Sequence, residues 1–423
     1  MSAPVLTAAA PRRLSGLALG VLMTLANVLG YVFVLIATRA LGPAQFGAFS
    51  AVNSTGLLLA IPVGAIQVVV ARRQAVHPGT GLRIAAGLGL ALAVLGALGS
   101  LLVVDAFHLS GPRTVVLAMA NLLPMAITAA LQGVLLGRGR LIAFGVSVLA
   151  TAVARTVAVA VVGVLHGSID ALFAALLLAG VVGAVLPAWQ ARRELRDLAP
   201  GLGAGALPEL LRANRTLGAL VALSSIDLLL ARHFLTPDDA GAYALGSVFS
   251  KVVMWGTQFL ALGIVPALHP STSRKRVLEA AGFVVAIGAG SVVGTMATAP
   301  LLVRAVGGAA YAHADGIIVW FVVLGVLLGL AQVLLYAGMA TDDGRLGLVT
   351  WVATAVIVVV VVGWQHQHAY RILATALVAT ALVVAVGFAA VLLRSPRDLT
   401  EEESATALSE LAPVLGGVPS LDA

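Results

Sequence analysis

The stretch "ATRALGPAQFGAFS", from Ala37 to Ser50, joins two long apolar runs near the start of the chain. A related stretch, "LARHFLTPDDAGAYALGS", joins two further apolar runs from Leu230 to Ser247. The two share four aligned positions, with one residue more between Arg and Pro in the second. The aligned pairs are Arg39 with Arg232, Pro43 with Pro237, Gly47 with Gly241 and Phe49 with Tyr243. This repetition predicts a chain of two related halves.

The composition identifies the surroundings of these hairpins. Of 423 residues, 60% are hydrophobic and only 10% are charged, and the mean hydropathy is +1.06. A soluble domain of this length cannot bury so much apolar side chain. Runs of about 20 apolar residues, enough to cross a hydrocarbon core roughly 30 Å thick, recur along the chain. We therefore predict an all-α polytopic membrane protein. Its first run, 14–38, exceeds the ~7–15 residues of a signal-peptide core and is expected to be a retained span.

A hydropathy window of about 19 residues predicts twelve transmembrane helices. The expected spans are 14–38, 46–71, 83–107, 114–136, 141–165, 171–190, 216–235, 239–268, 277–303, 315–340, 345–364 and 369–393. The break between the sixth and seventh spans, residues 191–215, is charged and rich in Gly and Pro, as is typical of an inter-lobe linker. The expected units are an N-terminal six-helix lobe (1–190), this cytoplasmic linker (191–215), a C-terminal six-helix lobe (216–393) and a cytoplasmic tail (394–423).

The basic residues orient this layout. Of 25 lysines and arginines, 18 fall in the loops of one side and five in those of the other, while Arg155 and Lys251 lie within spans. The positive-inside rule places the richer side, with both termini, in the cytoplasm. The two hairpins are six spans apart and keep the same orientation. The halves are thus predicted to be parallel repeats, related by a pseudo-two-fold axis along the membrane normal. The excess of Arg over Lys and the abundance of Ala suggest a bacterial source. We therefore expect the protein in the bacterial inner membrane.

The hairpins also carry a family resemblance. "LIATRALGPAQFGAFSAV", followed one helix later by "VVVARRQA", resembles the opening of polysaccharide and oligosaccharide-lipid flippases, within the multidrug/oligosaccharidyl-lipid/polysaccharide exporter (MOP) superfamily. "IDLLLARHFLTPDDAGAYALGSVFSKV" resembles the opening of that family's C-terminal lobe. The resemblance implies a transporter of polyprenyl-diphosphate-linked sugars that alternates access between two lobes around a central, often basic cavity. The chain departs from the family in its short loops and in having no span beyond twelve, and no particular sugar is implied.

Polar groups within spans are costly and usually face a bundle interior or a wet cavity. Tyr243, Ser247, Lys251, Met254 and Gln258 form one helical stripe, and Asn53 to Gln67 form another in the second span. Basic groups here suit a diphosphate. The candidate substrate-binding residues are Asn27, Arg39, Asn53, Gln67, Arg155, Arg232, Lys251 and Gln258. For the glutamines, a role as interhelical hydrogen-bond partners is preferred to sugar binding.

Asp227 has two interpretations. It pairs with Arg232 or Lys251 as a structural ion pair, or it is a cation or proton site that couples transport to a gradient. Pro43 and Pro237 are expected to begin helices, and Gly47 and Gly241 to permit close helix contact, with a tight hairpin as the simplest purpose of both motifs.

Several other functions are disfavoured. The sequence has no cysteine, no phosphate-binding GxxxxGK[ST] loop and no HExxH metal motif, so neither a cofactor nor a metal site is expected. His366 and His368 are two apart and would not share a helix face. The short outer loops argue against an enzyme, and the positive charge reflects topology rather than nucleic-acid binding. The alternatives kept open are a multidrug/cation antiporter of the same two-lobe plan and a non-transporting membrane scaffold. The expected partners are the lipid-linked sugar, membrane lipids and polysaccharide-assembly proteins, which the acidic tail could contact.

Overall fold

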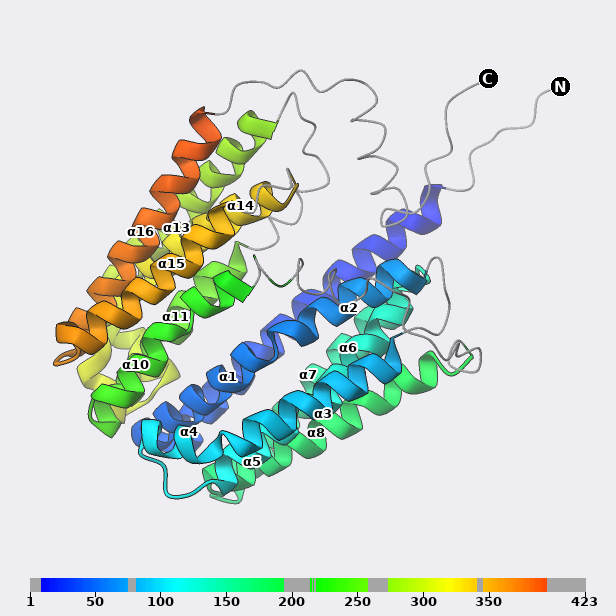
Figure 1. Ribbon diagram of the computed structural model, residues 1–423, viewed down its shortest axis with the longest axis horizontal. Helices are drawn as coiled ribbons and strands as arrows, with labels where there is room; N and C mark the ends of the chain where they lie inside the picture. The colour runs from blue at the N-terminus through cyan, green and yellow to red at the C-terminus, as the bar shows by residue number, and fades with distance from the viewer. Residues whose placement is uncertain are drawn as a thin grey trace.

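A computed structural model describes residues 9–74, 81–193, 214, 216, 218–257, 273–340 and 345–393, and these contain helices and turns without any strand (Figure 1). Each expected span has helix in its described part. Among these described residues, eight helices are long and apolar enough to cross a membrane, or nine with one bent pair counted as a single span. The expected all-α polytopic fold is confirmed. The predicted linker falls mostly, and the tail wholly, outside the described residues, as do the first residues of the chain.

The N-terminal half is built from eight helical segments. They are α1 (Ala9–Leu59), α2 (Ile61–Gln74), α3 (Leu82–Leu98), α4 (Ser100–Phe107), α5 (Arg113–Ala120), α6 (Leu122–Gly137), α7 (Leu141–Val164) and α8 (Ile169–Gln190). The first two expected spans share α1, which turns sharply at Gly42. This residue has φ 68° and ψ 174°, a backbone conformation that glycine adopts readily. Pro43 follows and begins the second half of α1, as predicted.

The described part of the C-terminal half is also helical. It comprises α10 (Ile226–Phe234), α11 (Pro237–Gly256), α13 (Ser273–Val306), η3 (Ala309–Ala314), α14 (Asp315–Ala340), α15 (Arg345–Val360), η4 (Val361–Gln365) and α16 (Ala369–Leu393). The expected limits of the tenth and twelfth spans, 315–340 and 369–393, coincide with α14 and α16. The second part of the eighth expected span, from residue 258, lies outside the described residues.

Several spans are broken where continuous helices were expected. The second is interrupted at Ala60, just before Pro62, whose ring cannot continue a helix interior. The third bends by 53° between α3 and α4, at Gly99. The fourth breaks at Asn121 and the seventh at Ser224 and Ser225. Each break falls at or beside a residue with weak helix propensity, but such residues also occur in the unbroken helices of this chain.

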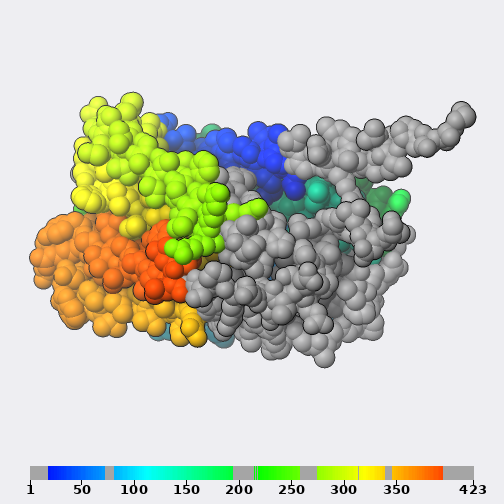
Figure 2. Space-filling view, turned by 90° about the horizontal axis from the view of Figure 1, so that it is seen from above, coloured from blue at the N-terminus to red at the C-terminus, as the bar shows by residue number. Residues whose placement is uncertain are grey.

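The two halves form separate lobes that meet at one end (Figure 1). We call this the closed end; it contains Gly42, the end of α4 and the α10–α11 turn. There α1 runs beside α10 and α11 of the other lobe. From the closed end the lobes diverge toward the opposite end, where α1 begins and α16 ends, which we call the terminus end. Figure 2, seen from above, shows the start of α13 and the end of α16 on the C-terminal lobe at that end.

Candidate functional site

The two repeated hairpins lie against each other across the closed end. A Cβ added to Gly47 would lie 2.9 Å from the Gly241 backbone nitrogen and 3.2 Å from the Ala240 carbonyl carbon. A Cβ on Gly241 would collide with the backbone of Pro43. Backbones this close require glycine on both sides, as in close helix contacts within membranes. The aligned glycines of the two repeats therefore form one contact between the lobes.

The first motif arginine reaches across to the C-terminal lobe. The Arg39 side chain is exposed, and its Nη2 donates to the Ala305 carbonyl oxygen at 2.5 Å. Beside it, the buried Thr38 hydroxyl donates to the Val306 carbonyl oxygen at 2.9 Å. These carbonyls end α13, where the last turn of a helix leaves acceptors without intrahelical partners. A cation is favoured there, because the helix dipole is negative at that end.

The second motif arginine makes the mirrored contact. Arg232, only 7% exposed, donates from Nε to the Phe107 carbonyl oxygen at 3.2 Å and from Nη1 to the Ala44 carbonyl oxygen at 3.5 Å. Phe107 ends α4, the third span of the N-terminal lobe, just as Ala305 is near the end of the third span of the C-terminal lobe. Each lobe thus places its motif arginine on the corresponding helix end of the other lobe.

The one-residue difference between the motifs has a local cause. After α1 turns, the left-handed Gly42 leads directly into Pro43. In the second hairpin, Leu235 is extended and Thr236 is the N-cap of α11; its hydroxyl accepts from the Asp239 backbone nitrogen at 3.3 Å and bonds the Asp239 carboxylate at 2.7 Å. A side-chain cap needs one residue more than a glycine turn does. Both routes nevertheless present the arginine and the glycine to the opposite lobe.

Rings also stack across the closed end. His108, at the end of α4, stacks on His233 of α10 with ring centroids 5.9 Å apart, and His233 Nδ1 lies 2.7 Å from the Ala106 carbonyl oxygen. Phe234 meets the His233 ring edge-on, with centroids 4.4 Å apart, and stacks on His366, 4.7 Å away. No group of three or more His, Cys, Asp or Glu suited to a metal occurs among the described residues. His366 and His368, which the sequence did not favour as a metal pair, stack on different rings: His366 on Phe234 and His368 on Tyr370.

Asp227 lies buried inside the C-terminal lobe. Its Oδ2 accepts a hydrogen bond of 2.9 Å from the Tyr243 hydroxyl, and it attracts the half-buried Lys251 electrostatically. The expected pairing with Arg232 is wrong, because the Arg232 guanidinium bonds the two carbonyls of the N-terminal lobe. Asp227 follows the break at Ser224–Ser225, and the buried Ser225 hydroxyl has no partner in the structure. A carboxylate beside a broken helix in the membrane can hold a cation or a proton.

The stripe on α11 faces the interior of its lobe rather than open space. Tyr243 and Ser247 are buried, and the Tyr243 ring packs edge-on against Phe321 of α14, with centroids 4.8 Å apart. Met254 is buried as well, so Lys251 is the half-buried member of the stripe. Gln258 lies outside the described residues. The prediction that this whole face lines a wet cavity is therefore wrong for Tyr243, Ser247 and Met254.

The remaining polar candidates lie in the N-terminal lobe. Arg155 of α7 is exposed, and its guanidinium carbon lies 5.6 Å from the centroid of Phe33 on α1. Asn27 on α1, Asn53 in its second half and Gln67 on α2 are all half-buried. In the part of the chain that the structure describes, no hydrogen bond or ion pair joins these four residues into one cluster. The structure brings Arg39 and Arg232 to the lobe junction, and Lys251 to Asp227.

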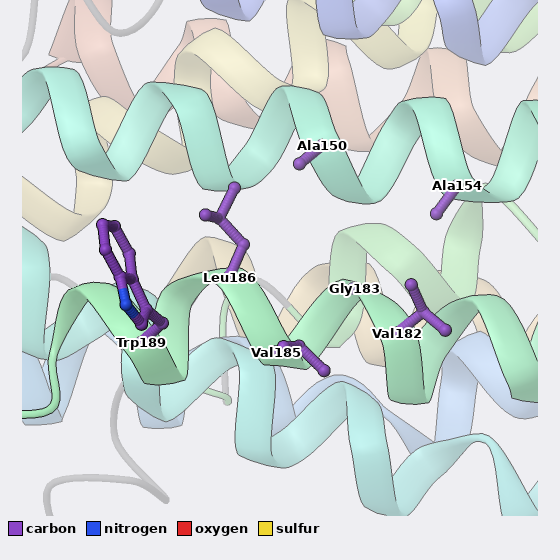
Figure 3. A pocket seen from close by; sticks show the side chains of 7 residues that line it. All are labelled: Ala150, Ala154, Val182, Gly183, Val185, Leu186 and Trp189. Atoms are coloured by element: carbon purple, nitrogen blue, oxygen red, sulfur yellow. The ribbon is translucent and has the colours of Figure 1, made fainter.

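A groove elsewhere on the N-terminal lobe is almost entirely apolar (Figure 3). It lies between α7 and α8 and is lined by Ala150, Ala154, Val182, Gly183, Val185, Leu186 and Trp189. None of its residues was a candidate from the sequence, and Trp189 is its only residue with a polar side-chain group. The junction and the groove are thus separate features.

No known protein family and no curated protein matches the sequence. Solved structures do match the fold. One described as the inward-facing conformation of a multidrug resistance MATE family transporter of the MOP superfamily has a TM-score of 0.65 at 15% identity, covering 87% of this chain and 94% of that one. Lipid II flippase MurJ in an inward closed conformation has a TM-score of 0.70 at 10% identity, covering 95% and 93%. A MOP superfamily transporter from Pyrococcus furiosus has a TM-score of 0.58 at 16% identity, covering 89% and 95%.

The chain therefore has the two-lobed fold of MOP superfamily transporters, as the resemblance of its two hairpins implied. The sequence missed the acceptors of the motif arginines, because backbone carbonyls at helix ends leave no residue-type signal. It also missed Tyr243 as the partner of Asp227, although their spacing across the second hairpin could have suggested it.

Proposed function

We propose that the protein is a transporter that moves a polyprenyl-diphosphate-linked oligosaccharide across the bacterial inner membrane by alternating access. One observation carries this proposal: the sequence repeat closes one end of the molecule with paired arginine contacts, while the lobes diverge at the other end. The arginine contacts and the close approach of Gly47 and Gly241 join the two lobes without sharing backbone hydrogen bonds within a helix, so they can be broken without unfolding either lobe. The likeness to a lipid II flippase supports a lipid-linked substrate.

The distribution of charged residues indicates which end of the molecule faces the cytoplasm. In the described part of the chain, basic residues gather at the terminus end, and few acidic residues lie there. These basic residues include Arg83, Arg138, Arg140, Arg192, Arg193, Arg274, Lys275, Arg276 and Arg345. By the positive-inside rule that end is cytoplasmic. The structure then corresponds to a state closed outside and open toward the cytoplasm, ready to accept a substrate made there. Both termini lie in the cytoplasm in this proposal.

Lys251 and Arg155 are the proposed contacts for the diphosphate. Lys251 is half-buried in α11, the helix that runs beside α1 at the junction, and Arg155 is exposed on α7, which also packs on α1. A charge left exposed within a span is costly in lipid, so it is best accommodated facing water between the lobes. Arg39 and Arg232 are assigned to closure in this state. They become available to substrate or solvent when the closed end opens.

The test is flipping in proteoliposomes, using a fluorescent polyprenyl-diphosphate sugar and an impermeant quencher. Lys251→Gln is expected to lower the flipping rate at least tenfold, because one charge-assisted contact to a phosphate contributes roughly 1.5–3 kcal/mol. Lys275→Gln is the matched control, since Lys275 is exposed at the terminus end and lies 3.9 Å from Glu279. Equal flipping by wild type, Lys251→Gln and Lys275→Gln would remove Lys251 from the site.

A multidrug/cation antiporter is the second proposal, and one observation favours it. Asp227 is a buried carboxylate that accepts a hydrogen bond from the Tyr243 hydroxyl and attracts Lys251 electrostatically. Such a site suits proton or cation coupling. Protein-dependent uptake of a cationic dye, with no flipping of any lipid-linked sugar, would establish the antiporter and reject the flippase.

A further inference from the structure

The groove between α7 and α8 combines an apolar floor with large exposed walls. It encloses about 510 Å³. Ala150, Ala154 and Gly183 leave its floor almost without side chains. A Cβ on Gly183 would lie 3.3 Å from the Thr151 hydroxyl oxygen, which shows how closely the two helices approach beneath. A groove of this kind in a membrane helix seam suits a segment of hydrocarbon chain, because its lining is almost entirely apolar and Trp189 is its only residue with a polar side-chain group.

The walls are set for contact with lipid. Val182, Val185 and Trp189 are 54%, 63% and 58% exposed, and Figure 3 shows them along α8 beside the open seam. The helices that pack against α8 all belong to the N-terminal lobe, so the groove lies away from the lobe junction. From Val182 to Trp189 the groove follows α8 for roughly 10 Å, given a rise of about 1.5 Å per residue.

One end of the groove is basic. Arg192 places its guanidinium carbon 4.8 Å from the centroid of the Trp189 ring, directly beyond the end of α8. Arg140 Nη1 donates to the Gln190 carbonyl oxygen at 2.6 Å, which brings the start of α7 to the same place. Arg192 and Arg193 are exposed. Guanidinium groups bind phosphate in a fixed geometry, and tryptophan favours the interface between hydrocarbon and headgroup.

We propose that this groove is a binding site for one anionic phospholipid of the surrounding bilayer. One acyl chain lies along the α7–α8 seam, over Ala150 and Ala154, and the phosphate sits at Arg192 and Arg193. Charge complementarity selects this occupant: a zwitterionic lipid fills the groove equally well but brings a cation to the arginines. The site differs from the transport pathway and does not depend on the transported substrate.

The experiment measures quenching of Trp189 fluorescence by lipids with brominated acyl chains, in vesicles that contain the full chain. The chain has five tryptophans, so the Trp189 signal is the difference between the protein and its Trp189→Phe variant. Brominated phosphatidylglycerol and brominated phosphatidylcholine are titrated separately into non-brominated phosphatidylcholine. We expect half-maximal quenching of Trp189 at a lower fraction of the anionic lipid. Each arginine near the membrane surface contributes about 1 kcal/mol, or roughly fivefold in binding.

Two sets of variants separate the parts of the site. Arg192→Gln with Arg193→Gln should bring the anionic lipid to the level of the zwitterionic one. Ala154→Leu should fill the groove and reduce quenching by both lipids. Ala174→Leu is its matched control. Ala174 is exposed on α8 and lies nine residues, or two and a half turns, before Gly183, so it is on the opposite face of the helix from the groove.

Three results would overturn the proposal. Equal quenching by both brominated lipids would show only bulk contact with the bilayer. Preference for the anionic lipid that survives the double arginine substitution would place the phosphate elsewhere. Quenching unchanged by Ala154→Leu would place the chain outside the groove.

Discussion

Gly47 of α1 and Gly241 of α11, the same position in two halves of one repeat, touch each other at the closed end of the molecule. The repeat thus does more than form two hairpins. It provides a contact surface that each lobe presents to the other, and the motif arginines bond helix ends on either side of it. The closed end is held mostly by backbone approach and by hydrogen bonds to carbonyls, which suits a contact that forms and breaks in each cycle.

Gly241→Val is expected to prevent closure. Its added carbons would occupy the space of the Pro43 backbone, and such overpacking typically costs about 1–3 kcal/mol. Because the lobes can relieve the clash by separating, we expect normal insertion but loss of transport. Flipping in proteoliposomes and the amount of protein in the membrane are measured together. Gly294→Val is the control, since Gly294 is exposed on α13 with no atom within 4 Å of its would-be Cβ. Full activity of Gly241→Val would show that the glycine contact is dispensable.

Arg39→Gln and Arg232→Gln should shift the protein away from the closed-outside state. Hydrogen bonds to charged donors are worth about 1.5–3 kcal/mol each, or at least roughly tenfold in the population ratio. Spin labels attached at Gln45→Cys and Asp238→Cys report the distance across the closed end, measured by pulsed electron paramagnetic resonance. Arg371→Gln is the control, because Arg371 lies at the same end but bonds Gln367 within its own lobe. A distance distribution unchanged in the double arginine variant would contradict the assigned role.

Asp227→Asn should abolish the dependence of transport on an ion gradient while leaving the fold intact, since an amide can still accept from the Tyr243 hydroxyl. Tyr243→Phe tests the same contact from the other side. It removes a buried donor and should lower the stability of the protein by about 1–3 kcal/mol, seen as a lower melting temperature in detergent. Ser247→Ala is its comparison, because the Ser247 hydroxyl bonds only a carbonyl within its own helix. Gradient-dependent transport by Asp227→Asn would exclude Asp227 as the coupling residue.

The sequence predicted the elements that depend on apolar length and charge. The limits of α14 and α16 follow from uninterrupted hydrophobic runs bounded by charged or polar residues, so 315–340 and 369–393 were predicted correctly. The two-lobed fold followed from the repeated hairpins, the hydrophobic runs, the break at 191–215 and the family resemblance together. The breaks at Gly99, Asn121 and Ser224–Ser225 were missed, because hydropathy does not distinguish a bent helix from a straight one.

The site was predicted less well than the fold. Arg39 and Arg232 were chosen as cationic groups for a substrate, yet in this state they bond carbonyls of Ala305 and Phe107, which any residue could have supplied. Tyr243 and Ser247 share a helix face with Lys251, but a polar stripe does not reveal whether it faces water or a neighbouring helix. Here it faces α14, because Phe321 packs against Tyr243.

The central claim is that the closed end must open for transport, and reversible cross-linking tests it most directly. The chain has no cysteine, so Gln45→Cys and Asp238→Cys, both at exposed positions of the closed end, can be joined by a cleavable bifunctional reagent without a background reaction. Flipping of the fluorescent lipid-linked sugar is measured before joining, after joining and after cleavage. We predict loss of flipping in the joined protein and recovery on cleavage, with each single-cysteine variant unaffected. Undiminished flipping with the closed end held shut would contradict alternating access in this protein.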